Sequence, residues 1–277
     1  KTISLKTISL KTISLKTLVA KTMNKIKANI QKIKSQINQA CHGSSHVTYQ
    51  VNSHEHSHSH KQESDPASNN RQNTVTLLAV SKTKPISAIE QAYLAGQRDF
   101  GENYLQEAIE KIIKLSNLPG ICWHFIGPIQ SNKTKQIAQH FSWVHSVDRA
   151  KIAHRLNGHL NDSSQQNYCQ DTSLNICLQV NISEESSKSG IMEDEVFSLA
   201  EVVDNCDKLT LRGLMAIPEK NAGEASYEKM QHLFKKLQAQ YPTVDTLSMG
   251  MSNDLEMAIA YGSTMVRIGT AIFGERS

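Results

Sequence analysis

From residue 74 onward, the sequence alternates short apolar runs with amphipathic stretches through to its end. The apolar runs predict eight strands, over Thr76–Val80, Arg98–Phe100, Cys122–Ile126, Trp143–Val147, Leu174–Ile182, Leu209–Ala216, Val244–Leu247 and Thr264–Ile268. Between them lie seven predicted helices, over Ile86–Ala95, Tyr104–Leu115, Asn132–His140, Arg149–Leu160, Glu193–Asn205, Ala225–Tyr241 and Asp254–Tyr261. Strict alternation of this kind predicts parallel strands joined by crossover helices.

An eighth helix is predicted ahead of the first strand. The stretch Met23–Ala40 has isoleucines at positions 26, 30, 33 and 37, which is the spacing of an amphipathic helix. Eight strands and eight helices favour a single-domain α/β fold, the (β/α)8 TIM barrel, over an open doubly wound sheet. An open sheet that bound a dinucleotide would carry a GxGxxG turn after its first strand, and the sequence has none there.

Two segments near the N-terminus stand apart from this pattern. Residues 1–22 are built on KTISL repeats, whose five-residue period fits neither a helix face nor a strand face, so we expect a low-complexity disordered leader. A lysine in every repeat leaves no membrane-spanning or secretory segment. The polar, His-rich stretch at about 42–73 is expected to be a flexible insertion in the barrel domain 23–277, with opportunistic metal or partner binding as the alternative.

Charge and cysteine content narrow the class of protein. The net charge of +4 divides into +8 on residues 1–75 and −4 on the remainder, so the body gives no case for a nucleic-acid surface. The five cysteines form no CxxC pair, which suits reduced thiols in a cytoplasmic protein.

A lysine follows the first predicted strand. The apolar run Leu77–Val80 stops at Ser81, and Lys82, Thr83 and Lys84 come next. An amine delivered at the end of a buried strand can lose its proton and form a Schiff base with an aldehyde. A lone SKTK stretch more often marks solvated charges at the edge of a loop, so its meaning depends on the other strand ends.

The turns after the seventh and eighth strands are suited to a phosphate. The stretches Ser248–Ser252 and Arg267–Thr270 combine small residues with hydroxyls, and a helix is expected to open at Ser252. Backbone N–H groups there can approach an anion closely, at the end of the barrel where chemistry collects. Each glycine alone would mark an ordinary turn. An amine, a phosphate cradle and the cation of Arg267 on one rim together predict a phosphorylated aldehyde cofactor, of which pyridoxal phosphate is the obvious candidate.

Seven motifs in this region carry a family resemblance. In order they are AVSKTKP, FGENY, WHFIGPIQSNK, SKSG, RGLMAIP, LSMGMSND and VRIGTAIFG. From about Thr76 to its end, the chain resembles the pyridoxal phosphate homeostasis protein family. The resemblance implies a single barrel similar to the N-terminal domain of alanine racemase, with pyridoxal 5'-phosphate (PLP) held by Lys82 as an internal aldimine. The KTISL repeats and the His-rich stretch are not family features.

The resemblance also implies the other cofactor-binding residues: Asn103, Ser248, Ser252, Arg267, Gly269 and Thr270. Ser252, Gly269 and Thr270 would hold the phosphate, and Arg267 would face the pyridine nitrogen. A cation there keeps the nitrogen unprotonated, because two adjacent cations repel. An unprotonated ring is a weak electron sink, which disfavours transamination and decarboxylation.

These features predict a protein of PLP homeostasis, which stores, buffers and delivers the cofactor and has no catalytic residues. The alternative is a PLP-dependent amino-acid racemase, which needs an acid or base on each face of the cofactor. Lys82 could serve one face, and the chain ends nine residues after Ile268, so we expect no second domain to supply the other. We expect a cytoplasmic monomer whose partners are PLP and apo PLP-dependent enzymes, with no nucleic acid and no membrane.

Three further lysines lie outside the cofactor-binding residues that the resemblance implies. Lys133 and Lys188 are expected in loops, as solvated charges or as a second landing place for the cofactor. Lys84 is expected to act through its charge, disfavouring the protonated form of Lys82.

Overall fold

Eight parallel strands close into one barrel, in the order β1 to β8, with β1 paired to β8. The computed structural model describes residues 25–42, 75–161, 173–183, 189–219 and 223–275, and the expectations for the leader and the His-rich stretch lie outside them. The strands are β1 (Thr76–Val80), β2 (Asp99–Glu102), β3 (Cys122–Phe125), β4 (Trp143–Val147), β5 (Leu174–Val180), β6 (Leu209–Ala216), β7 (Thr246–Ser248) and β8 (Met265–Ile268). The predicted (β/α)8 barrel is confirmed.

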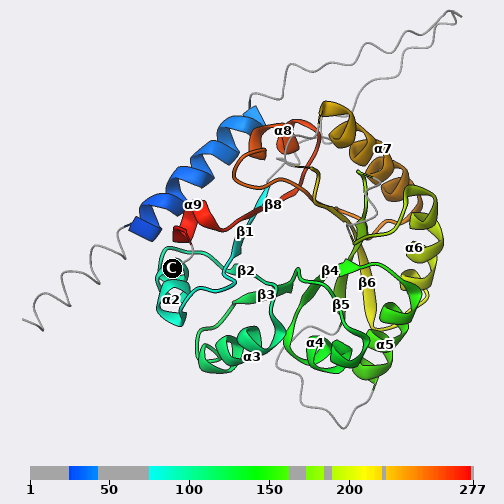
Figure 1. Ribbon diagram of the computed structural model, residues 1–277, viewed down its shortest axis with the longest axis horizontal. Helices are drawn as coiled ribbons and strands as arrows, with labels where there is room; N and C mark the ends of the chain where they lie inside the picture. The colour runs from blue at the N-terminus through cyan, green and yellow to red at the C-terminus, as the bar shows by residue number, and fades with distance from the viewer. Residues whose placement is uncertain (1–24, 43–74, 162–172, 184–188, 220–222, 276–277) are drawn as a thin grey trace, which may run out of the picture.

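Helices form a ring outside the strands (Figure 1). They are α2 (Ile86–Leu94), α3 (Leu105–Lys114), α4 (Thr134–His140), α5 (Ala150–Asn161), α6 (Val196–Asp204), α7 (Glu224–Gln240), α8 (Leu255–Ala260) and α9 (Thr270–Phe273). The 3-10 turns η2 (Ser131–Lys133) and η3 (Glu193–Glu195) precede α4 and α6. The sequence did not predict α9, because four residues are too few to show a helical period. No helix among the described ranges is long and apolar enough to cross a membrane.

The N-terminal helix, residues 25–42, covers the outside of the barrel near its seam (the blue helix beside α8 and α9 in Figure 1). Its four isoleucines are buried, as the helical spacing predicted: Ile26, Ile30, Ile33 and Ile37. The Nδ2 group of Asn29 donates a hydrogen bond of 2.9 Å to the carbonyl oxygen of Ile272 in α9. This hydrogen bond joins the N-terminal helix to α9, the helix that follows the last strand of the barrel.

The layer between strands and helices is apolar. Burying these side chains stabilises the fold by about 1.5–3 kcal/mol for each large aliphatic residue. The inside of the barrel is different, because polar side chains are buried there as well. His124, His145, Ser248 and Arg267 are each no more than 5% exposed. Buried polar groups need hydrogen-bond partners, so these residues must satisfy one another or the backbone.

Candidate functional site

The carboxyl ends of β8, β1 and β2 lie side by side on one rim of the barrel. Val80 of β1 pairs with Gly101 of β2, and Ala79 pairs with Ile268 of β8. The residues that follow these strands are therefore neighbours in space, although β1 and β8 are far apart in sequence. This register brings Lys82, Asn103 and Gly269 to a common rim.

Lys82 sits in a tight turn directly after β1. The N–H of Lys84 donates a hydrogen bond of 3.1 Å to the carbonyl oxygen of Ser81, which closes a four-residue turn. Thr83 has a φ of 61°, the left-handed conformation that the third position of a type II turn requires. A β-branched residue adopts this conformation at a cost of about 1–3 kcal/mol, and such strain gathers at functional sites.

A buried ion-pair cluster from β2 and α3 holds this turn. The Nζ group of Lys111 donates to the Ser81 carbonyl oxygen at 2.8 Å, to Glu102 at 2.8 Å and to Glu107 at 2.5 Å. Ser81 Oγ donates to Glu102 at 2.6 Å, and the N–H of Thr83 donates to Glu107 at 2.6 Å. The backbone on both sides of Lys82 is thus fixed by charged side chains.

Within this cluster, the ion pair between Lys111 and Glu102 is shielded from solvent. The Lys111 side chain is 5% exposed and that of Glu102 is fully buried. Burial raises the pKa of Glu102, and the charge and hydrogen bond of Lys111 oppose that rise. Removing Lys111 would leave the Glu102 carboxyl group buried without a cation, whereas Lys111 would still pair with Glu107 if Glu102 were removed.

Lys84 is directed to the last described residues of the chain. Its Nζ group donates to the carbonyl oxygens of Gly274 at 2.9 Å and Glu275 at 2.7 Å. This contact ties the turn after β1 to the segment after β8. Its expected electrostatic effect on Lys82 stays a prediction.

Asn103, directly after β2, carries an unused acceptor. Its Oδ1 atom is buried and has no hydrogen-bond partner within the described part of the chain. Gly127, after β3, lies against the same residue: a Cβ there would be 2.2 Å from the Asn103 carbonyl oxygen. Only glycine permits this approach, and a bound polar ligand would satisfy the orphaned Oδ1.

The turn after β8 also approaches β1 closely. A Cβ on Gly269 would lie 3.2 Å from the Val80 carbonyl oxygen, closer than an ordinary contact. Thr270, which is exposed, begins α9. The first N–H groups of a helix have no partner within the helix. Those of α9 follow β8 directly, at the rim that carries the Lys82 turn.

The turn after β7 differs from its prediction. The helix α8 begins at Leu255 and not at Ser252, which lies exposed in a turn ahead of it. Asp254 explains the later start: its Oδ1 accepts a bond of 2.6 Å from the Met251 N–H, and its Oδ2 accepts one of 2.7 Å from Tyr227. A cavity of about 530 Å³ lies here, lined in part by Ser252, Ile268 and Ala271. The turns after β7 and β8 therefore border one hollow.

Arg267 and Ser248 lie inside the barrel. The Arg267 guanidinium donates through NH1 to Ser248, at 2.6 Å to its carbonyl oxygen and at 2.9 Å to its Oγ, and through NH2 to the Ala216 carbonyl oxygen at 2.8 Å. Burial lowers the pKa of Arg267 to about 10, with the charge of Asp254 opposing, so the group is cationic at neutral pH. A cofactor ring at this rim would meet a fixed cation.

Two predicted secondary positions have different outcomes. Lys133 is half-buried at the end of the 3-10 turn η2, and not in an irregular loop. Lys188 lies outside the described residues. Neither observation tests a second cofactor site.

Several residues that hydrogen-bond to the turns of the site, or lie beneath them, belong to no motif that the sequence displays. Lys111 and Glu107 were visible only as an i,i+4 pair, which on an exposed helix would mean little. Asp254 was read as the start of a helix. His145 sat within an apolar run and carried no signal of its own.

Comparisons with known proteins agree with this architecture. Residues 67–277 match the family model described as alanine racemase, N-terminal domain. The pyridoxal phosphate homeostasis protein of Pseudomonas aeruginosa is 48% identical over 258 residues, which cover 92% of this chain and 97% of the relative. That of Escherichia coli is 53% identical over 211 residues, covering 73% of this chain and 86% of the relative.

A solved structure has the same fold. PipY of Synechococcus elongatus, with PLP bound, superposes with a TM-score of 0.64 at 36% sequence identity, over 72% of this chain and 92% of that one. Sequence and structure thus lead to the same conclusion: the chain belongs to the pyridoxal phosphate homeostasis protein family.

Proposed function

We propose that this protein binds pyridoxal 5'-phosphate and takes part in its homeostasis, storing the cofactor and handing it to enzymes that need it. The observation that carries the proposal is the meeting of three groups on one rim: the Lys82 turn, the close-approach turn at Gly269 and the buried Arg267. The relatives named for this role, and PipY with its bound PLP, support it.

Each residue has a role in this proposal. PLP supplies an aldehyde, a phosphate and a pyridine ring. Lys82 would hold the aldehyde end of the cofactor through its amine, the group that can form a Schiff base with an aldehyde. Ser252, Gly269 and Thr270 would bind the phosphate. The unpaired Oδ1 of Asn103 is an acceptor, so it would take a hydrogen bond from a donor group of the ligand and not from the phosphate oxygens. Arg267, held by Ser248, would face the pyridine ring.

Arg267 favours holding the cofactor over transforming it. Its guanidinium is fixed by three hydrogen bonds and is cationic at neutral pH. A proton on a ring nitrogen beside it would add a second positive charge, so the ring stays neutral and accepts electrons poorly. We therefore propose a carrier with no catalytic residue, acting in the cytoplasm as a monomer on apo PLP-dependent enzymes. The four cysteines within the described ranges are free thiols, which suits a reducing compartment.

An absorbance and transfer experiment tests this function. The purified protein is loaded with PLP and mixed with an apo-enzyme that requires it. We expect the visible band of the loaded protein to decay while the activity of the acceptor rises in proportion. Failure to bind PLP, or binding without any transfer, would contradict the proposal. Exchange of the Cα hydrogen of an amino acid with solvent deuterium, together with loss of optical rotation, would establish the racemase instead.

A further inference from the structure

A chain of polar side chains crosses the interior of the barrel from one mouth toward the other. Asp99 Oδ1 lies 3.2 Å from His124 Nε2, and His124 Nδ1 lies 3.0 Å from His145 Nε2. His145 Nδ1 lies 3.2 Å from Ser248 Oγ, which in turn lies 2.9 Å from Arg267 NH1. Five residues from five different strands thus form one continuous hydrogen-bonded array.

The array is dry except at its Asp99 end. His124, His145 and Ser248 are fully buried, and Arg267 is 5% exposed. The Asp99 side chain is 32% exposed. Asp99 and His124 both line a cavity of about 240 Å³ at the amino-terminal ends of the strands, together with Trp143, Arg212 and Asp245. The other end of the array is the guanidinium of Arg267, which would face the ring of the proposed cofactor.

The direction of each hydrogen bond follows from the groups available. Arg267 can only donate, so Ser248 Oγ accepts from it. At the other end the carboxylate of Asp99 can only accept, which fixes the direction of the array and leaves Ser248 to donate its own hydrogen to His145 Nδ1. A neutral His145 then carries its proton on Nε2 and donates to His124 Nδ1. His124 in turn carries its proton on Nε2 and donates to the carboxylate of Asp99. These proton positions are assigned from the network.

Both histidines are kept neutral by their surroundings. Burial lowers the pKa of His124, with Asp99 opposing. Burial lowers the pKa of His145 further, and the nearby His124 and Arg267 act in the same direction. A cation at one end, a carboxylate at the other and aligned neutral dipoles between them form a low-energy arrangement in a weakly polarisable interior.

We propose that His145, backed by His124 and Asp99, is a positioning residue that holds Ser248 and Arg267 in the orientation needed beneath the cofactor ring. The inference rests on the proposed function, because the ring is what Arg267 would face. The array thus carries the orientation of Ser248 and Arg267 back to residues that lie outside the proposed cofactor pocket.

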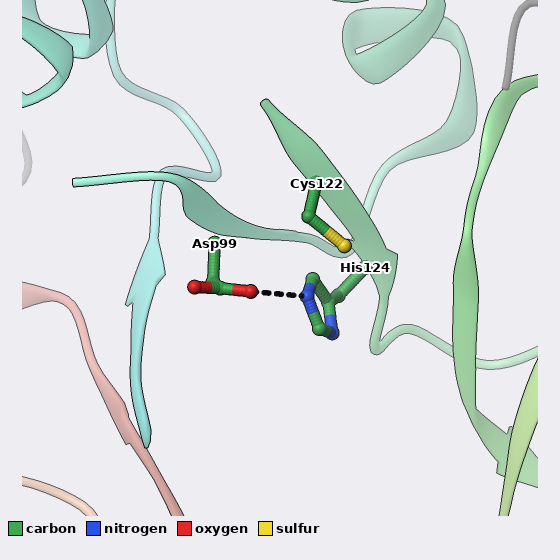
Figure 2. A group of neighbouring side chains, drawn as sticks. All are labelled: Asp99, Cys122 and His124. Carbon is green, nitrogen blue, oxygen red and sulfur yellow. Dashed lines mark hydrogen bonds and ion pairs between the residues drawn. The ribbon is translucent and has the colours of Figure 1, made fainter. Parts of the chain in front are cut away.

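A metal site is the competing interpretation of the Asp99 end. Asp99, Cys122 and His124 bring potential ligand atoms within 4.8 Å of one another, and Figure 2 shows them together, with Asp99 joined to His124. A metal at His124 Nε2 would need the position that carries the proton in this network. His124 Nδ1 already accepts from His145, so the ring would have to lose both protons or the whole array would have to reverse. The array therefore favours the hydrogen bond to Asp99.

Nitrogen NMR of the cofactor-free protein tests the array directly. With ¹⁵N-labelled histidine, and assignment by His124→Asn and His145→Asn, we expect both rings to be neutral Nε2–H tautomers at neutral pH. A Nδ1–H tautomer or a cationic ring at either position would overturn the proposal. So would a cobalt(II) charge-transfer band that disappears in Cys122→Ser. This test needs no PLP, so it decides the array even if the proposed function fails.

Variants of His145 test its effect on the cofactor. His145→Leu removes the acceptor for the Ser248 hydroxyl and should release PLP about tenfold faster, with a shifted visible band. His145→Asn offers Oδ1 in place of Nδ1 and should restore release to within about twofold of wild type. His140→Leu, on α4, is the matched buried control and should leave the band unchanged. Equal release and band position for Leu and wild type at position 145, in proteins that bind PLP, would overturn the positioning role.

Discussion

The ammonium group of Lys111 lies 2.8 Å from the carbonyl oxygen of Ser81, the residue directly before Lys82. A buried charge on α3 thus fixes the backbone that presents the proposed cofactor lysine. This contact explains how a strained turn with Thr83 at a φ of 61° persists in the folded protein. The position of Lys82 therefore depends on Lys111, which is not one of the residues proposed to bind the cofactor.

Lys82→Ala should abolish covalent attachment of PLP. The two neighbouring amines are engaged with other groups, Lys84 with the carbonyl oxygens after β8 and Lys111 with Ser81 and its carboxylates. Borohydride reduction should therefore leave no adduct on the protein. Mass spectrometry before and after reduction measures this. Lys114→Ala, on the exposed face of α3, is the control and should retain the adduct. An adduct of unchanged yield in Lys82→Ala would show that the assignment is wrong.

Lys111→Met should destabilise the protein by about 3 kcal/mol, because it leaves the carboxyl group of Glu102 buried without its cation. Urea unfolding measures the change. Lys114→Met removes an exposed charge from the same helix and should alter stability by less than about 0.5 kcal/mol. The double variant Glu102→Gln/Lys111→Met should recover part of the loss. Equal effects of the two lysine variants would contradict the clamp.

Gly127→Ala should weaken cofactor binding by displacing Asn103. Its Cβ would fall 2.2 Å from the Asn103 carbonyl oxygen, so the ends of β2 and β3 must separate. We expect affinity for PLP to fall roughly tenfold, for a cost of about 1.4 kcal/mol. Gly158→Ala lies in α5 with no atom within 4 Å of the added Cβ, and should raise stability by about 0.5–1 kcal/mol. Titration of both variants with PLP checks the contrast.

Stability should fall in mild acid because of the two buried histidines. The pKa values of His124 and His145 are lowered in the folded protein, whereas the unfolded chain takes up protons below about 6.5. Their contribution is therefore complete above the unfolded pKa and declines as the pH falls toward the folded values. Urea unfolding at several pH values between 8 and about 5 measures the slope. His145→Asn should flatten that slope, and an unchanged slope would contradict the neutral pair.

The barrel was readable from the sequence because each strand is a short apolar run bounded by polar residues. The strands β1, β4 and β6 have the bounds predicted for them. The strand β7 was predicted at Val244–Leu247 and is found at Thr246–Ser248, because Val244 is buried in the turn ahead of it. An apolar residue marks burial and does not by itself distinguish a strand from a turn packed on the core.

The site was only partly readable, for a different reason. The turns at Lys82 and Gly269 carry local chemistry that a sequence displays. The Ser81 carbonyl group that Lys111 contacts and the Ser248 hydroxyl that faces His145 lie 30 and 103 residues away, and contacts across a barrel depend on strand register. Side chains that act by holding others leave no motif, so the support of the site appeared only in three dimensions.

The seam between β1 and β8 has a consequence for how the protein is made. The Lys82 turn is synthesised well before the Gly269 turn, and their strands meet only when the barrel closes. A nascent or partly unfolded chain therefore lacks the complete binding site, and PLP should bind only to the folded barrel. A ligand that contacts residues after both β1 and β8 binds only the closed barrel. It therefore stabilises the folded state and slows the separation of these two strands. A barrel that has lost its cofactor should therefore open more often between β1 and β8, and proteases should cleave it faster than the loaded protein.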